Sequence, residues 1–369
     1  MNITIQKDEL EQRLSQAVKF VSTKTPTTQT IQGCFISIKN NGSFVLTTNL
    51  NDFFKAGIGP KIKEGGDAVF DIKKAIEFTS FLNPNEVNIY TEENSLVIEQ
   101  GKTKGYFNTF PKEEFPQIPQ TEGKDYPLTK KQLEAVGRVI YSASKDETRP
   151  ILTGIYFSNK NGKSHIVTTD GFRLSLLEEE ELKDLPQITI PAGIVNEVIK
   201  LATKDSKIKL KISDKEKLIT FTLNNFTICS RVLDGDFPPF EKVVPKTSTT
   251  QLLLNKQEFI KNLRLVSVFA REQSDVVILD VQKKGFYLRP KFHEAKKTEI
   301  FQEPDEFKGE ELKIAFNYKY ILEFLNNTTP EKVVLEFTQS TAPGLFKGEK
   351  DPNLIHIIMP LRTDETTSD

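Results

Sequence analysis

The fold is decided by a pattern that first appears in ITIQKDELEQRLSQAVKFVS at residues 3–22. Alternating apolar residues at its start predict a short strand, and a polar step with a lysine follows. Apolar residues then recur at helical spacing, as on one face of an amphipathic helix. The same order recurs in YPLTKKQLEAVGRVIYSAS at 126–144 and LLLNKQEFIKNLRLVSVFA at 252–270. Because Leu10, Leu133 and Phe259 hold equivalent places 123 and 126 residues apart, we expect three copies of one unit.

A second amphipathic helix recurs with nearly the same period. Its copies are DIKKAIEFTSFL at 71–82, PAGIVNEVIKLA at 191–202 and NYKYILEFLNN at 317–327. Each is followed by alternating apolar residues such as VNIYTEENSLVIEQ at 87–100, which predict antiparallel hairpins. The first two copies also end alike, in FPQIP at 115–119 and FPPFEKVVP at 237–245. These landmarks predict an α+β protein of three tandem domains, each with two helices packed on antiparallel sheet. We expect the domains to span 1–121, 122–246 and 247–369, the last ending in a polar tail.

Composition restricts the class of protein. With 37% hydrophobic and 27% charged residues among 369, the chain has the composition of a globular protein. Its longest apolar runs fall well short of the roughly 20 residues of a membrane-spanning helix. The polar start MNITIQKDEL lacks the apolar core of a signal peptide. Cys34 and Cys229 lie beside strand-like residues and are expected to be buried, reduced thiols. Together these features predict a cytoplasmic protein.

The net charge of −1 gives no general reason to expect nucleic acid binding, but the charges are unevenly distributed. The polar faces of the recurring helices are mostly basic, whereas acids gather in EEEE at 178–181 and in the tail. Lysine and arginine on such faces suit contact with DNA phosphates without base reading. The basic residues that we expect to face DNA are Lys24, Lys73, Arg138, Lys145, Arg149, Lys200, Lys204, Arg264 and Arg271. A solvated helix face explains the same bias, and the sequence leaves both interpretations open.

Three further stretches carry a resemblance. They are TTDGFRLS at 168–175, LDGDFPPFEKVVP at 233–245 and IIMPLR at 357–362. With the threefold repeat, they make the whole chain resemble the bacterial DNA polymerase III beta subunit family. The resemblance implies a DNA sliding clamp, in which two chains joined head to tail form a ring around double-stranded DNA. It implies a protein without catalytic residues, cofactor or metal. It also implies that the protein is cytoplasmic and associated with the nucleoid. The implied partners are the alpha subunit of the replicative polymerase, the clamp loader, and repair and regulatory proteins.

The resemblance also implies a groove that takes short peptides from these partners. Carried over by motif, its residues are Leu152, Thr169, Gly171, Phe172, Arg173, Leu174, Pro238, Lys242, Val243, Ile357, Ile358, Met359, Pro360, Leu361 and Arg362. Apolar residues here can accept peptide side chains, while Arg173 and Arg362 can bind a carboxylate or carbonyl. Taken singly, each residue is more often plain core or turn.

The sequence departs from the family pattern in places. Phe172 and Lys242 stand where members often have histidine and arginine, and the stretch KTPTTQTIQG at 24–33 replaces a more apolar run. The tail TDETTSD continues seven residues beyond Arg362. We expect the tail to be mobile and to modulate the groove through Asp364, Glu365 and Asp369. These departures bear on partner preference more than on the fold.

The sequence also bears on three other functions. An enzyme is disfavoured because the three histidines, His165, His293 and His356, lie in different copies with no metal or triad spacing. The stretch NKNGKSH at 159–165 lacks the first glycine of a phosphate-binding loop and is read as a hairpin turn. A repeat-built adaptor that binds proteins without encircling DNA would differ only in lacking a role for the basic helix faces. A specialised or accessory clamp, from a phage, plasmid or second gene copy, also fits the sequence.

Overall fold

The computed structural model describes residues 1–22, 29–272, 274–291 and 298–367, which form two compact units. The first unit contains residues 1–130 and 197–232, and the second contains 131–196 and 233–369. The predicted central repeat therefore contributes to both units. Its strands extend sheets that belong to the first and third repeats, and this shared backbone pairing binds each half to its neighbour.

The two recurring helices occur in all three copies, as predicted. The first is α1 (Lys7–Ala17), α3 (Lys130–Gly137) and α5 (Lys256–Ala270); the second is α2 (Ile72–Ser80), α4 (Ala192–Leu201) and α6 (Tyr318–Asn327). The first helix is shorter than expected in copies one and two, because it passes into a 3₁₀ turn at Val18–Phe20 and ends at Gly137, respectively. Side chains of Asp71, Asn255 and Asn317 cap the N-termini of α2, α5 and α6.

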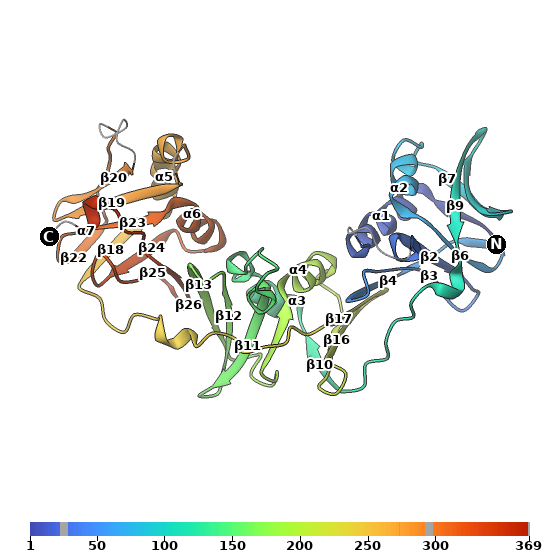
Figure 1. Cartoon of the computed structure of the whole chain (residues 1–369), viewed down its shortest axis with the longest axis horizontal. Helices are drawn as coiled ribbons and strands as arrows, with labels where there is room; N and C mark the ends of the chain where they lie inside the picture. The colour runs from blue at the N-terminus through green and yellow to red at the C-terminus, as the bar shows by residue number, and fades with distance from the viewer. Residues whose placement is uncertain (23–28, 273, 292–297, 368–369) are drawn as a thin grey trace. The chain divides into compact units, whose positions relative to one another are not determined.

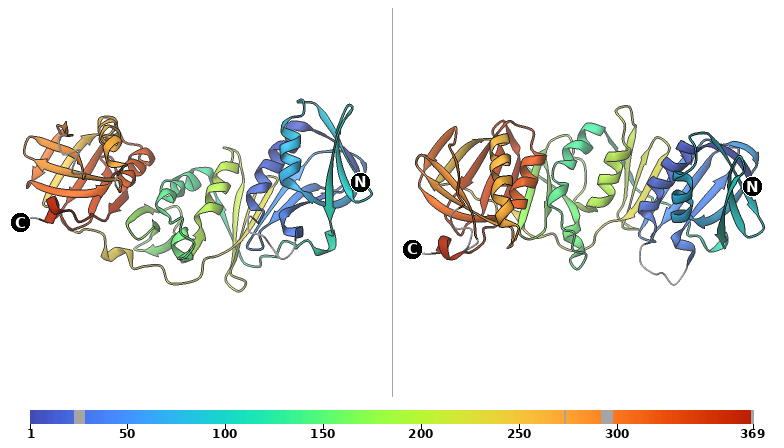
Figure 2. Two further views of the ribbon diagram at one scale, coloured as in Figure 1. Left: turned by 45° about the horizontal axis from the view of Figure 1, so that its top comes forward. Right: turned by 90° about the horizontal axis from the view of Figure 1, so that it is seen from above.

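The first unit is built on one long antiparallel sheet. Its described strands run in the order β10-β15-β16-β17-β4-β3-β2-β6-β9-β8-β7-β1-β5. Their bounds are β1 (Asn2–Gln6), β2 (Gly33–Ile38), β3 (Ser43–Thr48), β4 (Asp52–Ile58), β5 (Lys61–Glu64), β6 (Gly66–Asp71), β7 (Glu86–Glu92), β8 (Ser95–Gln100), β9 (Thr103–Phe110), β10 (Lys124–Leu128), β15 (Ile208–Ser213), β16 (Leu218–Leu223) and β17 (Phe226–Arg231). Helices α1 and α2 pack side by side (Figures 1 and 2). Leu10 and Leu14 of α1 are fully buried, as their spacing predicts.

The second unit has two antiparallel sheets, ordered β14-β11-β12-β13-β26-β25-β24-β18-β22 and β21-β20-β19-β23. The first comprises β11 (Gly154–Lys160), β12 (Lys163–Thr169), β13 (Arg173–Glu179), β14 (Ile188–Pro191), β18 (Thr250–Asn255), β22 (Glu306–Gly309), β24 (Lys332–Phe337), β25 (Gly344–Gly348) and β26 (Asp351–Ile358). The second comprises β19 (Val276–Gln282), β20 (Gly285–Pro290), β21 (Ile300–Gln302) and β23 (Leu312–Asn317). Helices α5 and α6 pack together over a core that includes Phe259, Phe316 and Phe324.

Successive copies are joined by the same kind of strand pairing. Strand β17 of the second copy pairs antiparallel with β4 of the first, with Cys229 opposite Phe53. Strand β26 of the third copy pairs antiparallel with β13 of the second, with Ile357 opposite Leu174. Each junction is therefore continuous sheet, whose backbone hydrogen bonds hold neighbouring copies together.

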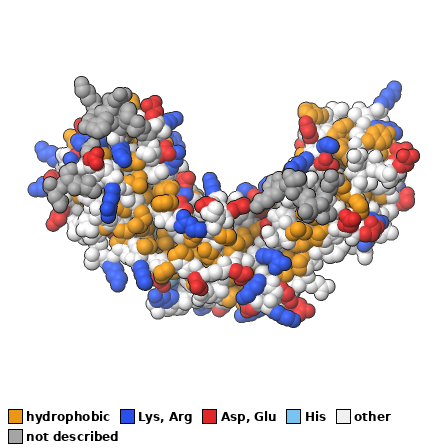
Figure 3. Space-filling view, viewed as in Figure 1, with side chains coloured by type: hydrophobic (Ala, Val, Ile, Leu, Met, Phe, Trp, Pro, Cys, Tyr) orange, Lys and Arg blue, Asp and Glu red, His pale blue; other side chains and the backbone are white. Residues whose placement is uncertain are grey.

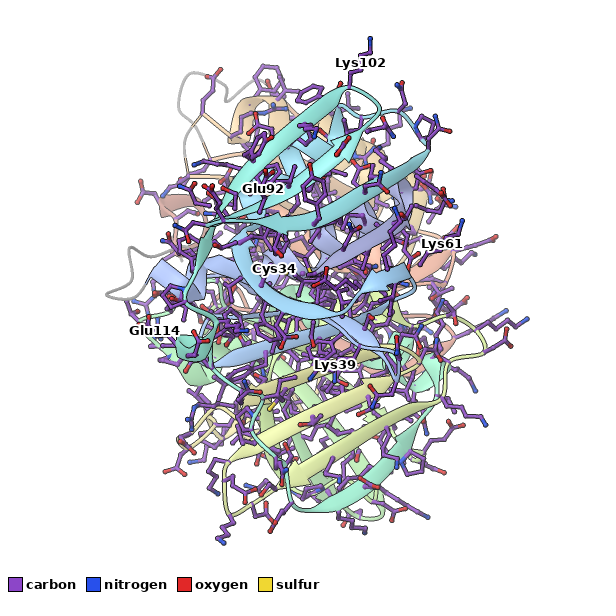
Figure 4. The ribbon with its side chains drawn as sticks, turned by 90° about the vertical axis from the view of Figure 1, so that its right-hand side faces the viewer. Cys34, Lys39, Lys61, Glu92, Lys102 and Glu114 are labelled. Atoms are coloured by element: carbon purple, nitrogen blue, oxygen red, sulfur yellow. The ribbon has the colours of Figure 1, made fainter. Side chains whose placement is uncertain are left out.

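Two sequence expectations concern single features. Cys34 and Cys229 are buried free thiols, as predicted, and burial raises the pKa of both. Figure 4 labels Cys34 on β2, among the strands of the first unit, with the exposed residues Lys61 and Lys102 farther out. The described helices include none long and apolar enough to span a membrane. The described residues also contain no cluster of three or more His, Cys, Asp or Glu side chains arranged to hold a metal ion.

Candidate functional site

An apolar groove lies where β13 meets β26 in the second unit. Its cavity of about 180 Å³ is lined by Arg149, Leu152, Thr169, Gly171, Arg173, Leu174, Pro238, Pro239, Phe240, Val243, Ile357 and Met359. Leu152, Leu174 and Ile357 are buried and form its apolar floor, while Val243 and Met359 stand partly exposed at the rim. A cavity of roughly 150 Å³ can hold a benzene ring, so this one is large enough for an aromatic or branched aliphatic side chain.

One wall of the groove is the turn between β12 and β13. The Oδ1 of Asp170 accepts hydrogen bonds from the backbone N–H groups of Phe172 and Arg173, at 2.9 and 3.0 Å. The hydroxyl of Thr169 donates to the carbonyl of Arg173 and accepts from the N–H of Gly171. Gly171 has a φ of +93°, which favours glycine. The side chains of Thr169 and Asp170 and the positive φ of Gly171 therefore determine the backbone conformation of this wall.

The opposite wall comes from the last strand and from the linker before the third copy. The N–H of Met359 donates to the carbonyl of Phe172 at 2.8 Å, which holds Met359 at the rim. Phe240 of the linker packs with Leu174 and Ile357, and Phe237 stacks on Tyr156 at 4.6 Å between ring centroids. The groove is therefore assembled from segments that lie far apart in the sequence.

Arg173 is buried beneath the groove, with 7% of its surface exposed. Its Nε donates to Asp170 at 3.1 Å, its Nη1 pairs with Glu323, and its Nη2 donates to the carbonyl of Tyr141 at 2.8 Å. The guanidinium also stacks over the Tyr320 ring at 4.4 Å. Each of its three nitrogens is already engaged, so Arg173 holds the turn to α6 and has two of its five N–H groups left for a ligand.

A buried polar group extends this arrangement. The Nδ1 of His356 lies 2.8 Å from the hydroxyl of Ser175 and 3.2 Å from that of Tyr141. Its ring stacks on Phe324. Burial, together with the nearby Arg173 charge, lowers the pKa of His356 to about 3. The histidine is therefore neutral at physiological pH and is a structural part of the junction.

Arg149 supplies the exposed cation that Arg173 cannot. It lines the apolar groove and also a neighbouring, more polar cavity of about 280 Å³. That second cavity also includes Lys145, Asp170, Phe172 and Tyr320. Together the two cavities place an apolar pocket beside a polar one, which is lined by two exposed basic side chains and by Asp146 and Asp170. This arrangement suits an extended ligand with an apolar anchor and a polar or acidic neighbour.

The chain matches three family models in order. These are the N-terminal domain of the DNA polymerase III beta subunit at residues 1–119, its central domain at 128–239 and its C-terminal domain at 241–362. The chain belongs to the DNA polymerase III beta subunit family. It is accordingly a DNA sliding clamp, a processivity subunit without catalysis of its own.

Individual relatives support the assignment to the beta subunit family over the full length. The beta sliding clamp of Bacillus subtilis is 27% identical over 381 residues, covering 98% of this chain and all of the relative. The crystal structure of a B. subtilis sliding clamp has a TM-score of 0.87 at 26% identity, covering 98% of this chain and 99% of that one. A Bartonella birtlesii sliding clamp bound to griselimycin has a TM-score of 0.90 at 23% identity, covering 98% and 100%.

Most groove residues expected from the beta subunit family come together in the structure. Those that line the apolar cavity are Leu152, Thr169, Gly171, Arg173, Leu174, Pro238, Val243, Ile357 and Met359. Phe172 lines the neighbouring cavity instead, whereas Lys242, Pro360, Leu361 and Arg362 are not among the lining residues of either. Ile358 points into the core of the third copy, because alternate residues of a strand face opposite sides. Sequence reasoning missed Pro239 and Phe240, although both stand in the FPPF motif.

The expected DNA-facing residues of this beta subunit divide into three groups. Exposed side chains are Lys73, Lys145, Lys200, Lys204, Arg264 and Arg271. Arg138 is half-buried in an ion pair with Asp351, and Arg149 is exposed but lines the groove. Lys24 lies outside the described residues. On the face shown in Figure 3, lysine and arginine side chains are interspersed with acidic ones, with no single block of one sign.

Proposed function

We propose that this sliding clamp holds its protein partners by short peptides bound in the groove at the β13–β26 junction, while the ring encircles duplex DNA. The observation that carries the proposal is the apolar cavity beside an exposed Arg149. An apolar anchor side chain would enter between Leu152, Leu174 and Ile357. Arg149 and Lys145 would bind acidic or carbonyl groups of the same peptide. The alpha subunit of the replicative polymerase and the clamp loader are the partners that we expect to supply such peptides.

We propose that two chains close the ring head to tail by repeating the junction that already joins the copies. In the described part of the chain, β21 pairs only with β20, and residues 103–108 of β9 pair only with β8. These two strands hold the places of β13 and β17 in the other copies. Pairing β21 of one chain with β9 of its partner would use both open edges, and two such contacts close a ring.

Apolar side chains accompany both open edges. Phe81 at the end of α2 is 83% exposed, and Tyr106 lies on β9 itself. Val268 on α5 is 51% exposed, and Phe301 lies on β21. Isolated exposed apolar residues are ordinary, but groups beside unpaired strand edges mark contact surfaces. We therefore assign these two groups to the dimer interface.

The other exposed basic residues on or next to the recurring helices are proposed to face the DNA, namely Lys73, Lys200, Lys204, Arg264 and Arg271. Diffuse attraction between these side chains and phosphates is independent of sequence and screened by salt, so the duplex can slide. This role places the clamp in the cytoplasm, at the nucleoid. We also propose domain bounds of 1–121, 122–246 and 247–369, which fall in the linkers between recurring elements.

The groove assignment is tested with griselimycin, the ligand held by the B. birtlesii relative. Met359→Glu places a charge at the apolar rim of the groove and should weaken griselimycin binding at least tenfold in a calorimetric titration. Val268→Glu, on the proposed dimer surface, is the matched control and should leave binding unchanged. Equal binding by wild type and Met359→Glu would remove the groove as the ligand site.

A further inference from the structure

The outer face of the sheet is covered in the same way in the first two copies. In copy one, Phe115 of the segment after β9 stacks on Phe35 of β2, with ring centroids 5.5 Å apart. In copy two, Phe237 of the segment after β17 stacks on Tyr156 of β11 at 4.6 Å. Phe35 and Tyr156 are each the third residue of their strand. In both copies, therefore, the chain that leaves the last strand returns across the sheet and stacks an aromatic ring on the same position.

The third copy has an equivalent apolar face. Ile278 is the third residue of β19, and it forms a buried cluster with Val276 and Ala315. Its neighbours Val277 and Leu279 belong to the core beneath α5 and α6, so Ile278 points to the opposite, outer face. Only 1% of Ile278 is exposed. Other residues of the chain therefore cover this face.

The tail lies beside this face. The N–H of Leu361 donates to the carbonyl of Ala315 at 2.8 Å, on the edge strand β23. A short helix, α7 (Asp364–Thr367), then packs against β23, as Figure 1 shows at the C-terminal end. Ala315 stands opposite Ile278 in the β19–β23 register. The tail therefore follows the last strand of its copy, as the two linkers do, and packs along β23, the strand next to Ile278.

The described tail has its own local order. The hydroxyl of Thr363 accepts from the N–H of Thr366 at 3.2 Å, and the hydroxyl of Thr366 accepts from the N–H of Thr363 at 3.0 Å. This reciprocal pair is a capping box in which threonine replaces the usual glutamate. Both threonines are buried, with 6% and 9% of their surface exposed. Of the tail that was expected to be mobile, residues 363–369, Thr363 and Thr366 are thus buried and hydrogen-bonded to each other.

We propose that residues 361–366 are a third covering segment, which anchors the Met359 wall of the groove to the third domain. The backbone N–H of Met359 donates a hydrogen bond to Phe172 in the second copy, and the backbone N–H of Leu361 donates one to Ala315 in the third. With only Pro360 between them, the position of one fixes the other. The capping box at Thr363 and Thr366 holds the end of this connection. The inference rests on the proposed peptide-binding role of the groove for its functional consequence only.

One truncated and two full-length variants test whether residues 361–366 anchor the Met359 wall. Deletion of 364–369 removes the helix, Thr366→Val removes one hydroxyl at nearly constant size, and Thr366→Ser keeps the hydroxyl as the matched control. Hydrogen exchange of the Leu361 amide reports the anchor itself, and calorimetric titration with griselimycin reports the groove. We expect the deletion and Thr366→Val to speed Leu361 exchange about fivefold or more, and to weaken griselimycin binding several-fold. Thr366→Ser should behave as wild type in both measurements.

The outcomes separate the two proposals. Wild-type exchange at Leu361 in the deletion variant would overturn the covering segment. Faster exchange with unchanged griselimycin affinity would overturn its control of the Met359 wall. If griselimycin fails to bind the wild-type groove, the peptide-binding proposal fails, while the Leu361 exchange rates still decide whether the tail is an anchor.

Discussion

The backbone N–H of Met359 lies 2.8 Å from the carbonyl oxygen of Phe172, 187 positions earlier in the chain. This hydrogen bond joins the two walls of the groove. The walls belong to different copies of the repeat, so the groove exists only when the β13–β26 junction is formed. Changes that loosen the junction should therefore weaken ligand binding even where they touch no ligand.

Gly171 offers the first prediction. Its φ of +93° disfavours any residue with a Cβ, although a Cβ would find only Arg149 Nη1, at 3.6 Å. Gly171→Ala should therefore strain or move the turn, at a cost of about 1 kcal/mol, and weaken griselimycin binding several-fold in a calorimetric titration. The matched control is Gly162→Ala, in the β11–β12 turn, where φ is +79° and no atom lies within 4 Å of the new Cβ. Equal losses in both variants would contradict a local role for Gly171.

Arg149 and Arg173 should respond in opposite ways to replacement by alanine. Arg173→Ala leaves Asp170 and Glu323 without their shared partner, and should destabilise the second unit by roughly 2 kcal/mol or more. Arg149→Ala removes an exposed side chain and should leave stability within about 0.5 kcal/mol. Urea unfolding measures both values. Binding of a peptide with an acidic residue beside its apolar anchor should weaken in Arg149→Ala, and an unchanged affinity would exclude Arg149 as the cation of the groove.

His356 predicts a pH dependence of stability. Its folded pKa, about 3, lies below the value of 6.5 expected in the unfolded chain. The unfolded state therefore binds the proton first as the pH falls, and the free energy of unfolding decreases from about pH 6.5 toward pH 3. Between pH 7 and pH 5 the loss should be roughly 2 kcal/mol. In His356→Gln this part of the pH dependence should vanish. Parallel urea midpoints for both proteins across that range would contradict the buried, neutral histidine.

The dimer surface is tested by Val268→Glu. A charge at this exposed α5 position should oppose burial against the partner chain and shift the protein toward monomer in size-exclusion chromatography with light scattering. Met359→Glu, also at an exposed apolar position but on the groove rim, should keep the wild-type mass. A stable dimer in Val268→Glu would place the interface elsewhere.

Much of the architecture could be predicted because it repeats. Leu10, Leu133 and Phe259 hold the same helical position three times, and each is buried against its sheet. The turn at Thr169, Asp170 and Gly171 could also be predicted, because side chains of the turn itself form the hydrogen bonds of its backbone. In both cases the determining contacts are close in sequence.

Other features could not be predicted because their partners are distant. Arg173 resembles an exposed ligand-binding arginine until Glu323 and Tyr320 are brought beside it. Arg138 appears on a basic helix, but Asp351 lies 213 positions away. The tail is polar throughout, and its composition does not indicate that Thr363 and Thr366 are buried where α7 packs against β23. Composition describes a segment by itself, whereas burial depends on what the fold places opposite it.

Retention on DNA of different topology tests the central claim most directly. The clamp is loaded onto nicked circular plasmid by a clamp loader, separated from free protein by gel filtration, and then exposed to an enzyme that cuts the plasmid once. A ring that encircles the duplex should stay with the circle at moderate salt and be released when the DNA is linearised. Equal retention before and after cutting, or salt-sensitive loss from the intact circle, would contradict an encircling clamp.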